Sequence, residues 1–182
     1  MVRTFQLTKS LSRLTVLDNM LLAAPGQTGE RFLPALLQVW RGQEAVNRTK
    51  ALALLERYNL AAKRDDLAGT LSGGQRKLLE MARALMVDPR LVMLDEPMAG
   101  VNPALVQSLL DHIRELRDEG RTVVFVEHDM DVVMNVSDWV VCLAEGRVIA
   151  EGPPASIVRD EAVIDAYLGA RHGPRPGARE DD

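Results

Sequence analysis

The sequence predicts an α/β fold in which a parallel sheet forms the core and a helical subdomain precedes it. Two short apolar runs, Leu91–Leu94 and Thr122–Val126, have the length of buried strands, and the second is rich in β-branched residues. An amphipathic helix lies between them. Strand, helix and strand in this order are typical of a βαβ unit with a buried parallel sheet.

The helix between the two strands has clear boundaries in the sequence. Asn102 is a favourable N-cap, Pro103 suits the first helical position, and Gly120 suits the C-terminal cap. The apolar positions fall on one side of this helix: Leu105, Val106, Leu109, Leu110, Ile113 and Leu116.

From Thr15 to about Asp88, before the strand at Leu91–Leu94, the spacing of apolar residues is mostly that of helices. Thr15 and Asp18 resemble a capping box that opens its first helix. The other expected segments are a strand end in residues 1–7, a loop at 25–29, helices near 30–40 and 43–58, and a polar turn at 65–70. After the second strand, Glu145-Gly146 predicts a hairpin, and residues 170–182 predict a disordered tail.

Composition excludes several classes of protein. The 182 residues contain 47% hydrophobic and 26% charged residues, which is typical of a folded globular chain. The formal net charge of −4 argues against a protein that binds nucleic acid through a basic face. Cys142 is the single cysteine, so no internal disulfide can form, and no apolar run reaches membrane-spanning length. We therefore expect a cytoplasmic chain.

The first motif with chemical content is Leu71–Arg76. Ser72 and Gln75 form a capping box at a helix start, followed in the first turn by Gly73 and Gly74. Two glycines there cost about 0.5–1 kcal/mol each relative to alanine, but they leave backbone N–H groups accessible at the positive end of the helix dipole. This pattern predicts an anion site; the alternative is an ordinary helix start with a flexible entry.

The second motif is the strand ending in Asp95 and Glu96, which places two carboxylates at the carboxyl edge of the sheet. One acid can hold Mg²⁺ through its water shell, and the next can orient or deprotonate a water that attacks a γ-phosphate. The alternative is a solvated strand end. His128, after the next strand, is expected at the same edge, where its imidazole could donate to a phosphate oxygen.

Taken together, these motifs resemble those of the nucleotide-binding subunits of ATP-binding cassette (ABC) transporters. Leu71–Gln75 resembles the signature motif, and Leu91–Glu96 resembles the Walker B strand. The resemblance implies that Asp95 is the Mg²⁺-associated acid, Glu96 the catalytic base and His128 the switch histidine.

Two further segments extend the resemblance. Gln6 matches the Q-loop glutamine, which joins the core to the helical subdomain and senses Mg²⁺ and the attacking water. Residues 97–103 fall where the D-loop lies, including Gly100 and Asn102, with Asn102 standing where aspartate is more common. Within the family, the segments Arg3–Gln6, Glu96–Pro103, Val126–Met130 and Ala166–Gly169 resemble the LivG-type branched-chain amino-acid uptake branch.

The resemblance implies an ABC-type, P-loop NTPase-like nucleotide-binding domain over residues 1–169. Its helical subdomain would span about 15–88 and its catalytic core about 89–169. The phosphate-binding pattern G-x-x-x-x-G-K-S/T is not found in the sequence. We therefore expect that the N-terminal β-region and P-loop are missing, and that the chain alone binds ATP weakly and hydrolyses it negligibly.

The implied cofactors and partners follow from the family. ATP and Mg²⁺ would bind between two nucleotide-binding subunits, in a homo- or heterodimer, with Ser72, Gly73, Gly74 and Gln75 completing the partner's site. Permease subunits, and indirectly a solute-binding protein, would place the chain on the inner face of the cell membrane. Leu11–Val16 would contact the permease, although the same pattern fits a buried helix start. The alternatives are an incompetent subunit that donates only its signature motif and a non-transport ABC protein.

Overall fold

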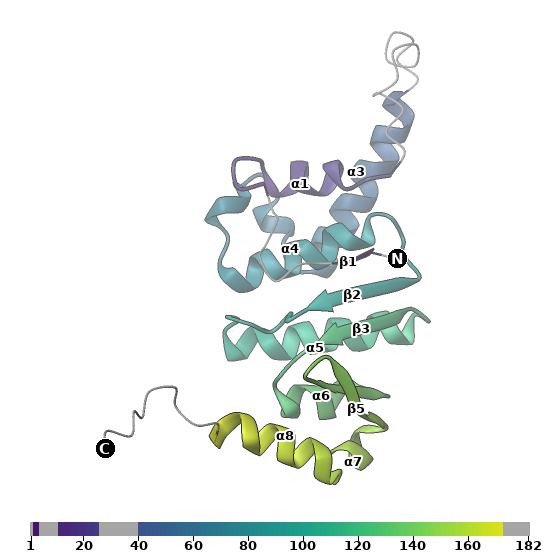
Figure 1. Cartoon of the computed structure of the whole chain (residues 1–182). Helices are drawn as coiled ribbons and strands as arrows, with labels where there is room; N and C mark the ends of the chain where they lie inside the picture. Colours follow the sequence, from purple (N-terminus) through teal and green to yellow (C-terminus); the bar gives the residue numbers. More distant parts are fainter. Residues whose placement is uncertain (1, 4–10, 26–39, 173–182) are drawn as a thin grey trace, which may run out of the picture. The chain divides into compact units, whose positions relative to one another are not determined.

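The computed structural model describes residues 2–3, 11–25 and 40–172 (Figure 1). These residues form two compact units, Met1–Glu127 and His128–Asp182, which are described separately below. Gln6 lies outside the described residues, and so does most of the helix expected near residues 30–40. The boundary between these two compact units, at residue 127, differs from the expected boundary between a helical subdomain and a catalytic core near residue 88. The boundary near residue 88 stays a prediction.

The first unit contains a three-stranded parallel sheet in the order β1 (Val2–Arg3), β2 (Leu91–Asp95) and β3 (Thr122–Val126). The register runs from Leu91 opposite Thr122 to Asp95 opposite Val126. Helix α5 (Pro103–Asp118) connects β2 to β3 and packs against β3. The predicted βαβ unit is confirmed.

The two central strands differ in burial, and here the sequence-based prediction is partly wrong. On β2, Val92 and Leu94 are buried, as expected. On β3, Val124 and Val126 are 43% and 58% exposed. The reason is position: β3 lies at the edge of the described sheet, so one of its faces is open within the described residues.

Helix α5 has the predicted ends. The Oδ1 atom of Asn102 accepts a hydrogen bond from the Ala104 N–H at 2.9 Å, and Pro103 is the first helical residue. At the other end, Gly120 has φ +81° and donates to the Arg117 carbonyl at 2.8 Å, while Arg121 donates to the Leu116 carbonyl at 3.1 Å. This pair of bonds is a Schellman motif, which needs the left-handed glycine.

Helices α1 (Val16–Leu22), α3 (Trp40–Arg57) and α4 (Gly73–Leu85) pack against one another, with short 3₁₀ helices η2 (Ala61–Lys63) and η3 (Ala68–Thr70) between α3 and α4. Thr15 caps α1 as predicted, because its Oγ1 accepts from the Asp18 N–H at 3.0 Å. Fully buried residues fill the space between these helices: Val16, Met20, Leu55, Leu60 and Leu79.

The segment at 65–70 is a largely exposed turn, as expected, and it ends in η3. Ala68 is its buried residue, and the Ala68 N–H donates to the Leu14 carbonyl at 2.9 Å. Val16, expected among permease contacts, is fully buried, whereas Leu11 is 50% exposed. The buried-helix-start alternative therefore holds for Val16.

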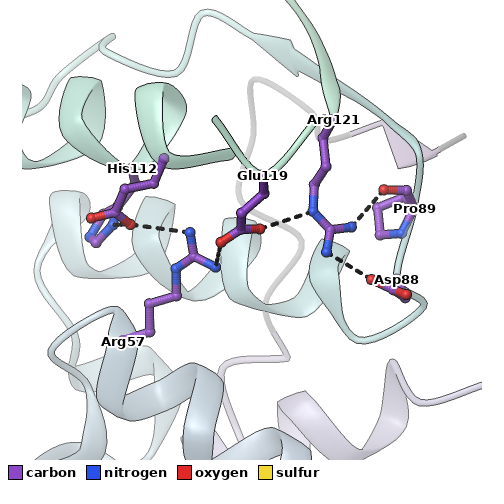
Figure 2. Close-up of polar contacts among 7 residues, drawn as sticks. Arg57, Asp88, Pro89, His112, Glu119 and Arg121 are labelled. Carbon is purple, nitrogen blue, oxygen red and sulfur yellow. Dashed lines mark hydrogen bonds and ion pairs between the residues drawn. The ribbon is translucent and has the colours of Figure 1, made fainter. Parts of the chain in front are cut away.

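A chain of ion pairs links α3 to α5 and to the start of β2 (Figure 2). Arg57 lies 3.1 Å from Glu115 and 2.6 Å from Glu119, both on α5. Arg121 then joins Glu119, at 3.2 Å, to Asp88, at 2.8 Å. The hydrogen bond from Arg121 holds the pKa of the Asp88 carboxyl below its usual range.

The second unit contains α6 (Met130–Val136), the antiparallel strands β4 (Val140–Ala144) and β5 (Arg147–Gly152), α7 (Pro154–Ile157) and α8 (Glu161–His172). The predicted hairpin is confirmed, and Glu145 and Gly146 both have positive φ, as a type I′ turn requires. Helix α8 continues to His172, so it covers the first three residues of the expected tail; residues 173–182 lie outside the described part.

Among the helices that the structure describes, none combines the length and the apolar character needed to cross a bilayer.

Candidate functional site

The start of α4 is built by a capping box, as predicted. The hydroxyl of Ser72 accepts from the Gln75 N–H at 3.3 Å, and the side-chain oxygen of Gln75 accepts from the Ser72 N–H at 2.9 Å. Ser72 and Gly73 are exposed, whereas Gly74 is buried. The side-chain oxygen of Gln75 thus serves the cap, and the exposed first turn carries Ser72 and Gly73.

Gly74 is buried, and its neighbours leave little room for a side chain there. A Cβ atom added at Gly74 would lie 2.5 Å from Leu105 Cδ1 and 3.4 Å from Val101 Cγ1, both beyond the turn that follows β2. A Cβ at Gly73 would meet only the Gly100 carbonyl, at 3.6 Å. The start of α4 therefore lies directly against the expected D-loop segment, a proximity that the sequence did not predict.

The turn after β2 holds Glu96 in an unusual backbone conformation. Its φ is +43°, in the left-handed region that residues other than glycine rarely adopt. The next residue is Pro97, and residues before proline normally take extended conformations. Such strain costs about 1–3 kcal/mol and persists only when the surroundings hold it.

Three hydrogen bonds hold this conformation. The Glu96 N–H donates to the Val126 carbonyl of β3 at 3.0 Å. The Glu96 carbonyl accepts from the Ala99 N–H and from the Nζ atom of Lys77, each at 3.2 Å. The backbone of Glu96 is thus fixed from three sides: by β3, by its own turn and by α4.

Sequence reasoning missed Lys77, which is buried at 9% exposure in the second turn of α4. A signal was present, because Lys77 stands on the same helical face as Gly74, Leu78 and Met81, all of them buried. A cation within an apolar helix face needs a polar partner in the interior. The identity of that partner, 19 positions away, could not be read from the pattern.

Glu127 was also missed. Its Oε1 atom accepts from the Met98 N–H at 2.9 Å, so the residue that follows β3 stabilises the turn that follows β2. Asp95 and Val126 are opposite each other in the sheet, which brings the two strand ends together. In the sequence, no feature distinguishes Glu127 from any solvated acid at a strand end.

The other predicted site residues have simpler surroundings. Asp95 and Glu96 are half-buried at the carboxyl end of β2. Gly100 is exposed with φ +69°, and the Asn102 side chain caps α5. His128 is exposed and is the first residue of the second unit, so its meeting with Glu96 stays a prediction.

Asp95 is the residue on which Mg²⁺ binding would depend. Within the described residues, no group of three His, Cys, Asp or Glu side chains is arranged to hold a metal ion. Mg²⁺ bound with nucleotide typically needs only one or two carboxylates, since phosphates and waters supply its other ligands. A single half-buried carboxylate at a strand end fits that arrangement and does not fit a protein-only metal cage.

Comparison with known proteins decides the family. A protein-family model described as "ABC transporter" matches residues 1–99, which include the start of α4 and the Asp95–Glu96 pair. The chain belongs to this family. Residues 147–173 of this ABC family member also match a model described as "Branched-chain amino acid ATP-binding cassette transporter".

Curated relatives and solved structures agree with this. The chain is 43% identical over 170 residues to a probable branched-chain amino acid transport ATP-binding protein LivG of Archaeoglobus fulgidus, covering 93% of this chain and 66% of that protein. It is 40% identical to BraF, a high-affinity branched-chain amino acid transport ATP-binding protein of Pseudomonas aeruginosa, covering 92% and 67%. A nucleotide-free ATP-binding cassette from an ABC transporter superposes with a TM-score of 0.75 at 38% identity, covering 92% of this chain and 68% of that one.

These figures confirm the ABC cassette fold that the motifs predicted. The chain spans about two thirds of the length of these relatives.

Proposed function

We propose that the chain is an ATP-binding and ATP-hydrolysing subunit that powers an ABC importer of branched-chain amino acids. The observation that supports it most is the turn after β2, where the Glu96 backbone is held in a left-handed conformation by α4 and β3. Asn59, Asp88 and Glu145 also have positive φ, so what distinguishes Glu96 is a backbone bonded to both β3 and α4 at the carboxyl end of a central strand. The solute class comes from the relatives, which are branched-chain amino acid transport ATP-binding proteins by name.

In this proposal Glu96 is the general base. A carboxylate at the carboxyl end of a parallel strand can accept a proton from the water that attacks the γ-phosphate. Its fixed backbone limits the directions in which the carboxylate can point, so less ordering is needed in the transition state. Gln6 and His128 would orient the same water and the γ-phosphate.

The first turn of α4 would bind the nucleotide held by a second subunit. The exposed Ser72 hydroxyl and the N–H groups at Gly73 and Gly74 lie at the positive end of the helix, where a phosphate is favoured. Asp95 would hold Mg²⁺ through water, and the ion would supply charge neutralisation of the phosphates.

The proposed partners are a second nucleotide-binding subunit and the permease subunits, with a solute-binding protein acting indirectly. The chain would sit on the inner face of the membrane. Leu11, before α1, and Leu22, its last residue, are 50% and 53% exposed, so both are available for a permease contact. Val16 is excluded from that contact by its burial.

Uptake measurements test this function. We expect that deleting the gene from its host abolishes high-affinity uptake of radiolabelled leucine and leaves arginine uptake unchanged. The wild-type gene should restore leucine uptake and E96Q should not. E56Q, the same substitution at an exposed residue of α3, is the matched control and should restore it. Unchanged leucine uptake in the deletion strain, or restoration by E96Q, would contradict the proposal.

A further inference from the structure

The Lys77 side chain crosses from the second turn of α4 to the strained turn after β2. Its Nζ atom donates to the Glu96 carbonyl at 3.2 Å, and the residue is only 9% exposed. A buried ammonium is costly to desolvate, and the Glu96 carbonyl is one of the groups that offset this cost.

The same carbonyl already has a backbone donor. The Ala99 N–H reaches it at 3.2 Å and closes the turn. A charged donor makes a stronger hydrogen bond than a neutral one, so Lys77 adds a second and stronger restraint on the direction of the carbonyl. The direction of that carbonyl, together with the Glu96 N–H bonded to Val126, defines the backbone that carries the carboxylate.

We propose that Lys77 is a positioning residue for Glu96, whose left-handed backbone it holds so that the carboxylate is aimed for catalysis. The catalytic role of the carboxylate in this inference rests on the proposed function. The effect of Lys77 on the backbone conformation of Glu96 does not depend on that function. Because α4 begins at Ser72–Gly74, the same rigid helix that presents the signature motif also holds the base, which couples the position of one to the position of the other.

The first test is structural and needs no activity. In the full chain, the ¹³Cα and ¹³Cβ chemical shifts of Glu96 report its backbone conformation. We expect K77M to move them away from left-handed values, and K77R, which keeps a charged donor, to preserve most of them. K63M, at an exposed lysine that pairs with Asp66, is the matched control and should leave them unchanged. Unchanged Glu96 shifts in K77M overturn the inference.

The second test is kinetic, in the assembled transporter. K77M should lower kcat for ATP hydrolysis roughly 10- to 100-fold and leave KM within about twofold, since Lys77 acts through Glu96. K77R should recover most of the loss. The double variant K77M/E96Q should be no slower than E96Q, because both changes remove the same function. Additive losses, or a loss confined to KM, overturn the inference.

Two controls separate this inference from the proposed function. If E96Q hydrolyses ATP as fast as the wild type, Glu96 is not the catalytic base. In that case only the chemical shifts test whether Lys77 holds the backbone of Glu96. If K77M lowers the thermal midpoint, the double variant distinguishes positioning from general destabilisation. A loss of active protein would multiply the E96Q defect in K77M/E96Q, whereas a loss of positioning adds nothing to it.

Discussion

The guanidinium of Arg57 on α3 lies 2.6 Å from the carboxylate of Glu119 on α5 and 3.1 Å from that of Glu115 (Figure 2). Arg57 thereby joins the helical part of the first unit to the helix that connects β2 and β3. Its guanidinium also lies 5.9 Å from the ring centroid of Tyr58. One side chain thus makes two contacts across this boundary and one with its own neighbour at the end of α3.

We expect R57A to lower the free energy of unfolding by about 1 kcal/mol, because the partner carboxylates are half exposed and solvent screens the attraction. The loss should shrink as salt is added. Urea unfolding at low and at high sodium chloride measures both effects. R64A, which removes a more exposed pair with Asp65, should change stability by less than half as much; equal losses for the two variants would refute the bridging role of Arg57.

We expect the stability of the fold to fall at alkaline pH because of the buried Tyr58 phenol. Burial raises its pKa from 10.0 to about 12, with Arg57 opposing the shift. The unfolded chain therefore loses the phenol proton from about pH 10, whereas the folded chain keeps it until about pH 12. The neutral Tyr58 phenol therefore contributes its full stabilisation below pH 10. As the pH rises from 10 to 12, the free energy of unfolding falls by at most about 1.4 kcal/mol per pH unit.

Y58F isolates this contribution. Among the described residues, no partner hydrogen-bonds the buried Tyr58 hydroxyl, so its removal should raise stability at pH 8 by about 1 kcal/mol. The advantage of Y58F should grow between pH 10 and 12, measured by urea unfolding at each pH. A difference between Y58F and wild type that stays constant over that range would contradict the account.

Gly73 and Gly74, in the first turn of α4, should respond differently to alanine. At Gly73 a methyl group meets only ordinary contact, so G73A should raise helix stability by about 0.5–1 kcal/mol. At Gly74 it would force Leu105 to move, so G74A should gain less or lose stability. Thermal unfolding of both variants checks this. The double variant G74A/L105A, which removes the clashing methyl group, should recover stability relative to L105A; no recovery would exclude the proposed clash.

The left-handed backbone of Glu96 predicts the order of two substitutions. Glycine adopts positive φ without strain, so E96G should be more stable than E96A by about 1 kcal/mol. At the exposed Glu44, inside α3, the order should reverse, because glycine weakens a helix. Urea unfolding of the four variants makes the comparison. E96G and E96A of equal stability would show that Glu96 is not strained.

Local sequence signals predicted the local structure well. Asn102, Pro103 and Gly120 mark the ends of α5 because capping depends on neighbouring residues alone. The same is true of Ser72 and Gln75 at α4 and of the Glu145-Gly146 turn. The order of these elements was enough to predict the parallel sheet.

Features that depend on distant residues were not predicted. The exposure of Val126 depends on the strand's place at the sheet edge, and the bond between Lys77 and Glu96 joins residues 19 positions apart. The conformation of Glu96 runs against its local preference, since a following proline favours extended backbone. Such conflicts between local preference and observed structure are expected at functional sites.

ATP turnover by the purified assembly of this chain with the proposed nucleotide-binding and permease partners tests the central proposal most directly. Wild type and E96Q should bind ATP with dissociation constants within about threefold, because the carboxylate acts on the attacking water. E96Q should hydrolyse it at least roughly 100-fold more slowly. E56Q should match the wild type. Equal turnover by E96Q and wild type would contradict the assignment of Glu96 as the base, and with it the proposed function of this turn.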